Sequence, residues 1–387
     1  MRSAGPLRSL CPLLVVKILF WVSLAALVWT HLGYALVAAL AAPLRRRGVR
    51  AAAIEPVVSV VVAAYNEEDV IERRVRNLLE LDYPAERLEV VVASDSSADR
   101  TDEIVERLAA EDARVKLVRC PRGGKVAAQN RGVHESSGEI VAFSDANALW
   151  QEDALRKLVR SFADPAIGYV SGRASYEAAD GTNREGAYWR FELWLRGHES
   201  RLGSITAGNG PIYAVRRTDW VELEPWCGHD LGLPYLMVQR GRRAVYDPDA
   251  VSVEKPSRDL EDEYRRKVRM LRGAWVHVFR GMLRRVGPVY FVELVSHRLL
   301  RYGSGILHLL LLVTSIALVG EGWVYRAALL VQVAWLALAA AGRLRLPIPG
   351  AGLAYYYLLV TWATLAGLVR YLRFGPPLLW ERIEGTR

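Results

Sequence analysis

Four long runs without a charged residue constrain this chain of 387 residues more than any other feature. The first, Ile18 to Ala42, holds 25 residues, more than the ~20 needed to cross the hydrocarbon core of a bilayer. A cleaved signal peptide is the alternative, but its apolar core would hold only about 7 to 15 residues. Three further runs lie in the C-terminal third: Gly303 to Gly320, Ala327 to Gly342 and Leu346 to Val369. We therefore predict membrane-spanning helices at both ends of the chain.

Basic residues indicate the orientation of these helices, because the positive-inside rule places Lys and Arg in the cytoplasm. They follow the first run and separate the last two runs: Arg45, Arg46, Arg47, Arg50, Arg343 and Arg345. Three C-terminal crossings would leave the C-terminus outside. Four arginines near that end favour the inside: Arg370, Arg373, Arg382 and Arg387. One run would then be re-entrant, and the C-terminal topology stays open.

An amphipathic stretch precedes the first C-terminal run. Its apolar residues fall on one helical face: Phe291, Val292, Val295, Leu299 and Tyr302. Glu293, His297 and Arg301 fall on the other face. This pattern predicts a helix over residues 286–302 that lies in the membrane interface. An ordinary surface helix packed on a soluble domain is the alternative.

The middle of the chain alternates short β-branched runs with helical stretches, which predicts an α/β fold with a mostly parallel sheet and helices on both faces. The expected strands are Val57 to Ala64, Leu88 to Ser94, Val115 to Cys120 and Glu139 to Ser144. Helices are expected at Glu67 to Leu81, Asp99 to Ala110, Lys125 to Glu135 and Glu152 to Phe162. The predicted organisation is a span with its basic flank (1–50), a cytosolic domain (54–285), the interfacial helix (286–302), about three spans (303–372) and a tail (373–387).

Polar residues at the strand ends are informative, because ligands of such sheets bind beyond the carboxyl ends of the strands. Ala64-Tyr65-Asn66-Glu67 follows the first strand, and the segment from Ser94 to Thr101 follows the second. Asn66 and Asp99 are good helix N-caps. Asp95 lies four residues before Asp99 and has no capping role there, so it is a candidate for ligand binding.

The third and fourth strand ends carry charge and oxygen ligands. Arg122-Gly123-Gly124-Lys125 opens a helix and predicts a phosphate-facing loop. It is not a Walker A loop, because Val126 follows the lysine where Ser or Thr would stand. Asp145 and Asn147 follow the fourth strand at a spacing that lets both face one hard cation shared with a diphosphate. A turn with an Asn cap is the alternative.

Together these four segments resemble the nucleotide-sugar half of family 2 glycosyltransferases, which have the GT-A fold. The matching segments are Val58 to Glu68, Asp95 to Thr101, Gly124 to Asn130 and Asp145-Ala146-Asn147, the last at the family's D-x-D position. The resemblance covers about residues 54 to 275. It extends to the flanking membrane helices, as in the hyaluronan, poly-N-acetylglucosamine and cellulose synthase branch.

The resemblance implies roles for the matching residues. It assigns the uridine of a UDP-sugar to Ala64, Tyr65, Glu67 and Asp95. Lys125 is expected near the nucleotide, and Asp145 at the ribose, the diphosphate and a divalent Mg²⁺ or Mn²⁺. Asn147 replaces the usual second aspartate, and its neutral carbonyl brings less charge to the metal.

An inverting transfer needs a carboxylate that takes the proton of the acceptor hydroxyl. Asp230 stands where the family has its catalytic aspartate, and His229 replaces the preceding acid. Such a neighbour lowers the pKa of the aspartate relative to a carboxylate neighbour, which would leave a weaker base that is ionised at neutral pH. Asp230 as a helix N-cap is the alternative. Ahead of it, Gly208, Asn209 and Gly210 resemble the family's acceptor-side loop.

A basic segment follows the proposed base, at the position of the Q-x-x-R-W motif of processive synthases. Arg266 replaces the glutamine, Arg269 is kept, and Met270 replaces the tryptophan on which a sugar would stack. A guanidinium suits a leaving diphosphate, so we expect Arg269 to bind it with support from Arg266. Trp226 and Trp275 are candidates for the missing sugar platform on the acceptor side.

We interpret the chain as an inverting glycosyltransferase of the plasma (inner) membrane, multi-pass, with its catalytic domain in the cytosol. It would transfer a sugar from a UDP-sugar to a growing polysaccharide or a lipid-linked acceptor. A homo-oligomer and partner secretion proteins stay open. The alternative is a catalytically silent membrane scaffold that binds a nucleotide sugar or a partner synthase. No nucleic-acid partner is expected, because the net charge of +9 arises largely between residues 265 and 285.

Overall fold

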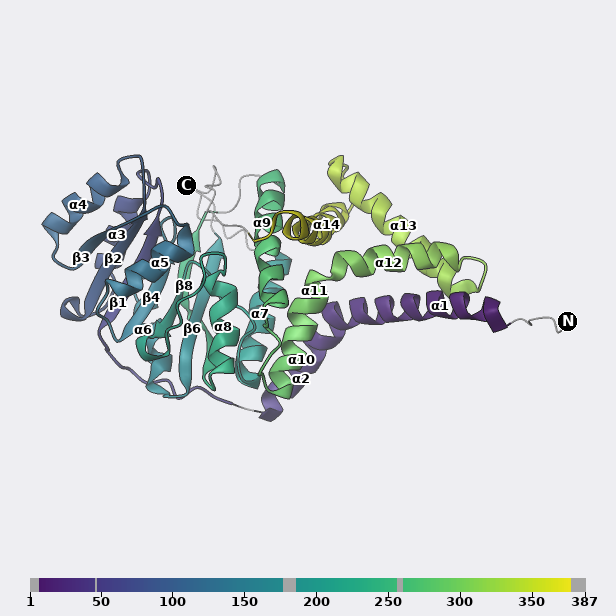
Figure 1. Ribbon diagram of the computed structural model, residues 1–387, viewed down its shortest axis with the longest axis horizontal. Helices are drawn as coiled ribbons and strands as arrows, with labels where there is room; N and C mark the ends of the chain where they lie inside the picture. Colours follow the sequence, from purple (N-terminus) through teal and green to yellow (C-terminus); the bar gives the residue numbers. More distant parts are fainter. Residues whose placement is uncertain (1–6, 46, 177–185, 256–259, 377–387) are drawn as a thin grey trace. The chain divides into compact units, whose positions relative to one another are not determined.

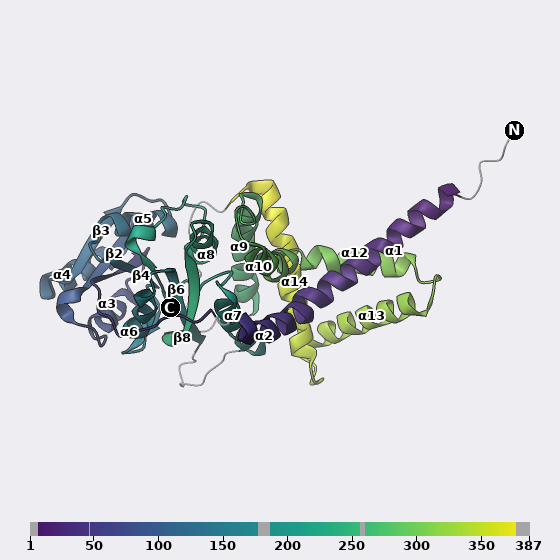
Figure 2. The ribbon, with the colours of Figure 1, turned by 90° about the horizontal axis from the view of Figure 1, so that it is seen from below.

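The computed structural model describes residues 7–45, 47–176, 186–255 and 260–376 (Figures 1 and 2). The chain divides into two compact units. The sheet unit comprises residues 37–263 and 276–294 of the described chain. The helical unit comprises residues 7–36, 264–275 and 295–375. Of the predicted tail, residues 377–387 lie outside the described residues.

The sheet unit is built on one eight-stranded sheet with the order β3-β2-β1-β4-β7-β6-β8-β5. Its strands are β1 (Val58–Ala64), β2 (Leu88–Asp95), β3 (Val115–Cys120), β4 (Ile140–Asp145), β5 (Leu149–Trp150), β6 (Ile167–Tyr176), β7 (Tyr213–Arg216) and β8 (Arg243–Glu254). The first four strands are parallel, as predicted. The rest of the sheet is mixed, because β7 runs antiparallel to β4 and β6, while β6 and β8 are parallel.

Helices cover both faces of this sheet. The helices of the unit are α3 (Ile71–Leu79), α4 (Thr101–Glu111), α5 (Lys125–His134), α6 (Ala154–Arg160), α7 (Ala187–Leu202), α8 (His229–Gln239) and α10 (Pro288–Glu293), with short 3₁₀ turns at Ala85–Arg87, Ser161–Ala163 and Arg217–Asp219. All seven residues of β1 are buried. Val60 and Val62 pack with α3, α4 and α6, whereas Val61 and Ala63 pack with α5 and α8. The unalternating apolar sequence of β1 thus reflects a strand covered on both faces.

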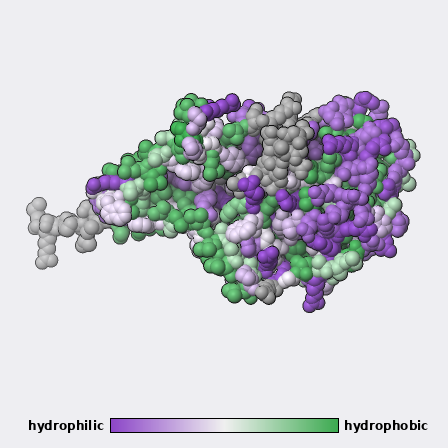
Figure 3. Space-filling view, turned by 180° about the vertical axis from the view of Figure 1, so that it is seen from behind, coloured by the Kyte–Doolittle hydropathy of each residue, from purple (hydrophilic) through white to green (hydrophobic). Residues whose placement is uncertain are grey.

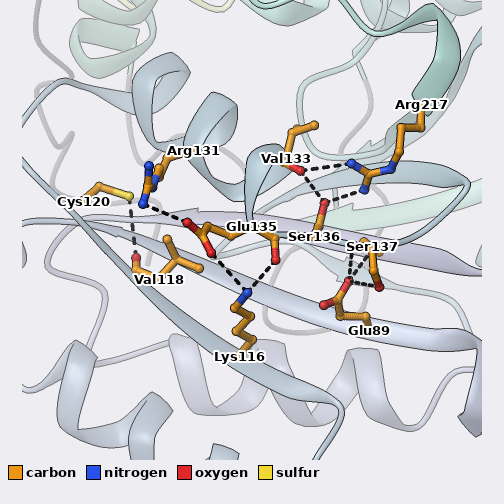
Figure 4. Close-up of polar contacts among 11 residues, drawn as sticks. Glu89, Lys116, Val118, Cys120, Arg131, Val133, Glu135, Ser136, Ser137 and Arg217 are labelled. Carbon is orange, nitrogen blue, oxygen red and sulfur yellow. Dashed lines mark hydrogen bonds and ion pairs between the residues drawn. The ribbon is translucent and has the colours of Figure 1, made fainter.

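The C-terminal end of α5 is tied to the sheet by charged side chains (Figure 4). Glu135 accepts from Arg131 at 2.8 Å and from Lys116 at 3.3 Å. Arg217 donates to the carbonyl oxygen of Val133 at 3.1 Å and to the hydroxyl of Ser136 at 2.7 Å. These contacts hold the C-terminal end of α5 against the sheet. Because Lys125 is the first residue of α5, they also help to fix the position of its backbone.

The helical unit holds the membrane-spanning candidates. Its helices are α1 (Leu7–Val28), the π-helical segment η1 (Trp29–Gly33), the start of α2 (Tyr34–Arg45), the middle of α9 (Leu260–Phe279), most of the π-helical segment η5 (Leu294–Leu299), α11 (Leu300–Tyr302), α12 (Ser304–Ala317), α13 (Trp323–Arg343) and α14 (Ala351–Phe374). Among the described residues, three helices are long and apolar enough to cross a membrane: Pro12–Arg45, Trp323–Arg343 and Ala351–Phe374. The bent pair Pro288–Tyr302 and Ser304–Ala317 would make a fourth span. Figure 3 shows a largely hydrophobic surface on this unit.

The stretch predicted as an amphipathic interfacial helix buries two residues of its predicted polar face. Glu293 and His297 are 2% and 0% exposed, whereas Phe291 and Val292 of the predicted apolar face are 43% and 48% exposed. Tyr302, also of the predicted apolar face, is 8% exposed. Both predicted faces therefore include buried residues, and the position of this helix in the membrane interface stays a prediction.

Candidate active site

The loops after β1 and β2 are hydrogen-bonded to each other. Asn66 and Ser96 both adopt positive φ, at 53° and 58°, so each strand ends in a sharp turn. The Asn66 side chain accepts the backbone N–H of Ala98 at 2.7 Å, and the Asn66 N–H donates to the Ser97 hydroxyl at 3.1 Å. Tyr65, which follows the buried Ala64, therefore lies in a loop with a fixed backbone.

Asp99 and Asp95 have different partners, as the sequence indicated. Asp99 accepts the N–H of Thr101 at 3.0 Å at the start of α4, in keeping with a capping role. Asp95 is 1% exposed and accepts the N–H groups of Gly123 at 2.7 Å and Gly124 at 3.0 Å. Its carboxylate also pairs with the Arg122 guanidinium. Asp95 thus holds the glycine loop that precedes Lys125.

Arg122 connects this glycine loop to the first strand end. Its guanidinium carbon lies 3.4 Å from the centre of the Tyr65 ring, a cation–π contact. Gly124 has φ of 89°, a conformation that favours glycine. The structure places Tyr65, Asp95, Arg122 and Gly124 in one constellation. Glu67, also predicted to bind the donor, is fully buried beside it, and its N–H donates to the Thr101 hydroxyl at 2.8 Å.

Lys125 and Asp145 form an ion pair at the carboxyl end of β4. Gly210 lies against this pair, because a Cβ atom built on it would be 3.8 Å from Asp145 Oδ2 and 3.9 Å from Lys125 Nζ. Residues from the third, fourth and acceptor-side segments of the prediction therefore meet at one point. Because Gly210 has no side chain, there is space beside Lys125 and Asp145. A larger residue at position 210 would fill this space.

The acceptor-side loop is bound to the proposed base. The N–H of Gly208 donates to the carbonyl oxygen of Asp230 at 2.7 Å, and a Cβ at Gly208 would collide with the Tyr169 hydroxyl. Asn209 is 4% exposed. Its amide accepts from Arg196 at 2.5 Å and donates to the Gly172 carbonyl oxygen at 2.6 Å. The Asn209 side chain therefore stabilises the loop from within, and a contact between this loop and an acceptor stays a prediction.

Asp230 lies in the first turn of α8, where the helix dipole favours a negative charge. Burial raises the pKa of its carboxyl, and the nearby Asp145 carboxylate acts in the same direction. The Lys125 ammonium lowers the pKa, as do the backbone N–H groups of Asp230 and Leu231. The three charges thus lie within electrostatic reach of one another. Burial, which the sequence could not reveal, opposes the low pKa that we expected.

His229 is a neutral structural partner of this turn. It is 3% exposed, and burial lowers its pKa to about 3. Asn130 Nδ2 donates to the Leu223 carbonyl oxygen at 2.7 Å, so Asn130 Oδ1 accepts from His229 Nε2 at 3.3 Å. His229 Nδ1 then accepts from the Tyr213 hydroxyl at 2.9 Å. Where the family has an acid, this chain carries an uncharged imidazole with both nitrogens engaged.

The remaining predicted residues are not all brought to this point. Trp226 lies in the sheet unit with Arg280 stacked 4.1 Å from its ring centre. Arg266 and Arg269 belong to the helical unit, so their predicted contact with the diphosphate stays a prediction. Trp275 is only 6% exposed and packs near Tyr302, at 6.3 Å between ring centres. It is therefore a poor candidate for a sugar platform.

A brace of three residues was not predicted from the sequence. Asn77 donates to the Trp150 carbonyl oxygen at 3.0 Å and accepts the Trp150 N–H at 2.9 Å. The Trp150 indole donates to the Pro211 carbonyl oxygen at 2.9 Å. The segment from Asp145 to Trp150 is thus held between α3 and the glycine loop of the acceptor side. The only sequence signal for this brace is a lone Trp five residues after Asp145.

A divalent metal fits this site only together with a diphosphate. Asp145 and Asn147 offer a carboxylate and a carbonyl oxygen, the ligand types that Mg²⁺ and Mn²⁺ accept alongside phosphates. Among the described residues, no group of three or more His, Cys, Asp or Glu side chains is placed to hold a metal by itself. The Lys125 ammonium on Asp145 shows that this carboxylate binds a cation. Asp145 and Asn147 are the residues that would hold the metal.

The sheet unit thus combines a half-sheet of parallel strands, a glycine-lysine loop and the buried Asp95 carboxylate that holds this loop. This arrangement is typical of α/β domains that bind nucleotide sugars. Residues 59–222 match the family model described as Glycosyl transferase family 2. The matched region, residues 59–222, is therefore a family 2 glycosyltransferase domain, in agreement with the resemblance and the GT-A fold class predicted from the sequence.

Several known proteins are similar to this chain in sequence. A beta-monoglucosyldiacylglycerol synthase of Synechocystis sp. (strain ATCC 27184 / PCC 6803 / Kazusa) is 33% identical over 223 residues, which are 54% of this chain and 47% of the synthase. An N-acetylglucosaminyltransferase of Rhizobium meliloti (strain 1021) is 27% identical over 67% of each chain. The chain thus spans about half the length of the first relative and two thirds of the second.

A solved structure resembles almost the whole chain. The mannosyltransferase PcManGT from Pyrobaculum calidifontis, in complex with GDP-Man and Mn²⁺, superposes with a TM-score of 0.69. The match covers 92% of this chain and 99% of the mannosyltransferase at 26% identity. The similarity therefore extends beyond residues 59–222 to the flanking helices.

Proposed function

We propose that this chain is a membrane-bound inverting glycosyltransferase that transfers a sugar from a nucleotide diphosphate sugar to an acceptor hydroxyl. The observation that carries the proposal is the meeting of Lys125, Asp145, Asp230 and the backbone of Gly208 to Gly210 at the carboxyl ends of the strands. A base, a cation and a small-residue loop are what an attack by a hydroxyl at a sugar carbon requires.

In this proposal the Asp230 carboxylate takes the proton of the acceptor hydroxyl. The oxygen forms a bond to the anomeric carbon from the face opposite to the leaving group, so the configuration inverts. The bond from that carbon to the diphosphate breaks, and the diphosphate departs with the electron pair. Lys125 stabilises the developing negative charge. A divalent metal at Asp145 and Asn147 would add positive charge at the diphosphate when bound.

The donor is proposed to be a UDP-sugar, on the resemblance of residues 58–101 to the uridine-binding segments of the family. Tyr65 provides the proposed base-binding surface, while the buried Asp95 pairs with the Arg122 side chain that lies over the Tyr65 ring. The structural neighbour was solved with GDP-Man, so GDP-mannose is the competing donor to include in any assay.

A lipid-linked acceptor is favoured over a polymer. The Synechocystis relative is named for a glucosylated diacylglycerol, and the chain has at least three helices suited to cross a membrane. Met270, 45% exposed, stands where processive synthases carry a tryptophan. Loss of that stacking surface removes a contact that would hold a growing chain between additions. We place the domain on the cytosolic side of the plasma membrane, from the basic residues that flank the spans.

Release of nucleotide diphosphate from purified protein in lipid nanodiscs tests the proposal. Wild type is incubated with UDP-sugars and GDP-mannose, with Mn²⁺ or with a chelator. Asp230→Asn should lower the rate by about 10²- to 10⁴-fold, since it removes the base. Asp153→Asn is the matched control, because Asp153 pairs with Lys157 on the surface of α6. Equal rates for wild type and Asp230→Asn would remove the enzymatic claim for this site.

Product sizing separates the two acceptor classes. One added sugar on an extractable lipid is the expected result. A ladder of products would show polymerisation and overturn the preference for single addition. Donor binding without any turnover by wild type would favour the scaffold, an alternative motivated by Asn147, His229 and Met270 in otherwise matching motifs.

A further inference from the structure

A buried arginine packs against the segment that carries the proposed metal ligands. Arg74 belongs to α3 and is 0% exposed, although it is one of the largest side chains in the interior. Its guanidinium carbon lies 5.0 Å from the centre of the Trp150 ring. Its Nη1 donates to Asn77 Oδ1, the oxygen that also accepts the Trp150 N–H at 2.9 Å. Arg74 is therefore part of the brace that holds residues 145–150.

The charge of Arg74 is not neutralised by direct contact. Among the described residues no carboxylate forms an ion pair with it, and its Nε and Nη2 atoms have no hydrogen-bond partner. Burial lowers the pKa of the guanidinium to about 9, so the group stays protonated at neutral pH. A buried charge without an ion-pair partner is destabilising, and a neutral side chain of similar volume would fill the same space. A purely structural role therefore explains Arg74 poorly.

The Arg74 charge acts on Asp145 through the interior of the sheet unit. Asp145 interacts electrostatically with Arg74, and Glu254 does so more weakly. Asp145 also forms the ion pair with Lys125. Lys125 belongs to α5, on one face of the sheet, whereas Arg74 belongs to α3, on the other face. The carboxylate at the end of β4 is thus attracted by two cations, one from each layer of helices.

These charges influence what can bind beside Asp145. Two further carboxylates oppose the cations, because Asp230 interacts with Asp145 and Glu254 with Arg74. Among these five groups, removal of Arg74 would leave one cation, Lys125, with three carboxylates. A diphosphate is attracted by each added positive charge, whereas a divalent metal is repelled by it. Arg74 therefore shifts the site toward the diphosphate and away from the metal.

We propose that Arg74 is a positioning residue of the donor site, whose buried charge lets a nucleoside diphosphate bind with little help from a divalent metal. This step rests on the proposed function, because it concerns the donor site at Lys125 and Asp145. Since Arg74 is fully buried, it acts through Asp145 and not by contact with the ligand. Asn147 agrees with the proposal, because a neutral amide attracts a metal less than a carboxylate does.

Binding of UDP to the full chain in lipid nanodiscs, measured by calorimetry without an acceptor, tests the proposal. For each protein the dissociation constant of UDP is measured in EDTA and in Mn²⁺, and the ratio of the two constants is compared. Wild type should bind UDP in both conditions, with constants within about tenfold of each other. Arg74→Gln should raise the ratio by about tenfold, the order that Coulomb's law gives for one charge in a partly buried site. The loss of affinity should be confined to EDTA.

Arg73→Gln is the matched control, because Arg73 is exposed on the same helix and its replacement changes the net charge equally. Its ratio should equal that of wild type, since solvent and salt screen an exposed charge. A general defect of the site would weaken UDP binding alike in EDTA and in Mn²⁺, which leaves the ratio unchanged. Arg74→Met provides a second neutral variant should Arg74→Gln fail to fold.

Two results would overturn the proposal and leave the donor site intact. One is an unchanged ratio in the Arg74 variant, and the other is UDP binding by wild type that requires Mn²⁺. In both cases the binding of UDP in Mn²⁺ still supports the proposed function. Wild type that binds neither UDP nor GDP, even with Mn²⁺, would refute the donor site itself and this proposal with it. Because no acceptor is present, a failure of sugar transfer does not affect these measurements.

Discussion

At the scale of single residues, the proposed base is controlled by its charged neighbours. Burial raises the pKa of Asp230 above its usual range, and Lys125 lowers it. A carboxylate acts as a base only when it is ionised. The value of kcat/KM should therefore fall as the pH drops through the pKa of Asp230, and any change to Lys125 should move that point.

Lys125→Met tests this coupling. Because the ammonium lowers the pKa of Asp230, its removal should shift the acidic limb of the kcat/KM profile to higher pH. Loss of a cation at the diphosphate should also reduce kcat/KM at its plateau by about a hundredfold. The pH profile of nucleotide diphosphate release measures both effects. Lys157→Met, a surface lysine on α6, should leave the profile unchanged. An unmoved acidic limb in Lys125→Met would contradict the coupling.

His229 should influence stability in acid. Its pKa is about 3 in the folded protein and about 6.5 when unfolded, so the unfolded chain binds the proton more tightly. The stability it supports is complete above pH 6.5 and is lost as the pH falls toward 3. His229→Gln should flatten the decrease of unfolding temperature between pH 6.5 and 4. His277, also buried, with its pKa lowered to about 4, should retain its own share of the decrease. An identical acid dependence in wild type and variant would refute this role.

The sequence indicated charged residues that the structure brings close together, but not their partners. Asp95, Lys125 and Asp145 stand at strand ends or a helix start, which the apolar pattern locates, whereas Asp230 was predicted from the family resemblance. The sequence does not show that the Asn209 side chain accepts a hydrogen bond from Arg196, because that contact depends on how α7 packs. Likewise, the neutral state of His229 follows from burial beside Tyr213, which lies on a strand that we did not predict.

At the scale of elements, predictions succeeded where apolar residues run without interruption. β1 to β4 were expected within one residue of their observed ends, since strands covered on both faces are continuous in sequence. β5 to β8 were missed, because β6 pairs with β7 and β8 across long stretches of chain. The burial of Glu293 and His297 was missed for another reason: the hydrophobic period of a helix does not tell which of its polar residues pack against neighbouring elements.

Trp150→Phe tests the brace between α3, β5 and the acceptor loop. The change keeps an aromatic ring and removes the indole N–H that donates to the Pro211 carbonyl oxygen. An unsatisfied buried carbonyl should cost about 1–3 kcal/mol of stability. Thermal unfolding in detergent should show a lower midpoint, with weaker acceptor binding because Gly210 loses its support. Trp194→Phe, at an exposed position on α7, is the control. Equal midpoints for all three proteins would show that the brace is not important.

At the scale of the whole molecule, the orientation of the spans can be measured. In a variant without its native cysteines, Leu346→Cys should react with an impermeant thiol reagent only from the cytosolic side, given Arg343 and Arg345 beside it. Gly320→Cys, next to Glu321, should react only from outside. Labelling in sealed vesicles of both orientations gives the answer. Reaction of both positions from one side would mean that α13 does not cross the membrane.

The two π-helical segments have a consequence for how this chain tolerates length changes. Thr30 of η1 donates to the Ser296 carbonyl oxygen of η5 at 2.6 Å, so the two wide turns are joined. Each π turn accommodates one residue more than an α turn. Deleting a residue from either turn would restore an ordinary α-helix of about 3.6 residues per turn, so the flanking faces of the span would keep their phase. The wide turn would be lost, however, and with it the geometry in which Thr30 donates to Ser296. A single-residue deletion is therefore expected to uncouple the two segments while the hydropathy profile stays almost unaltered.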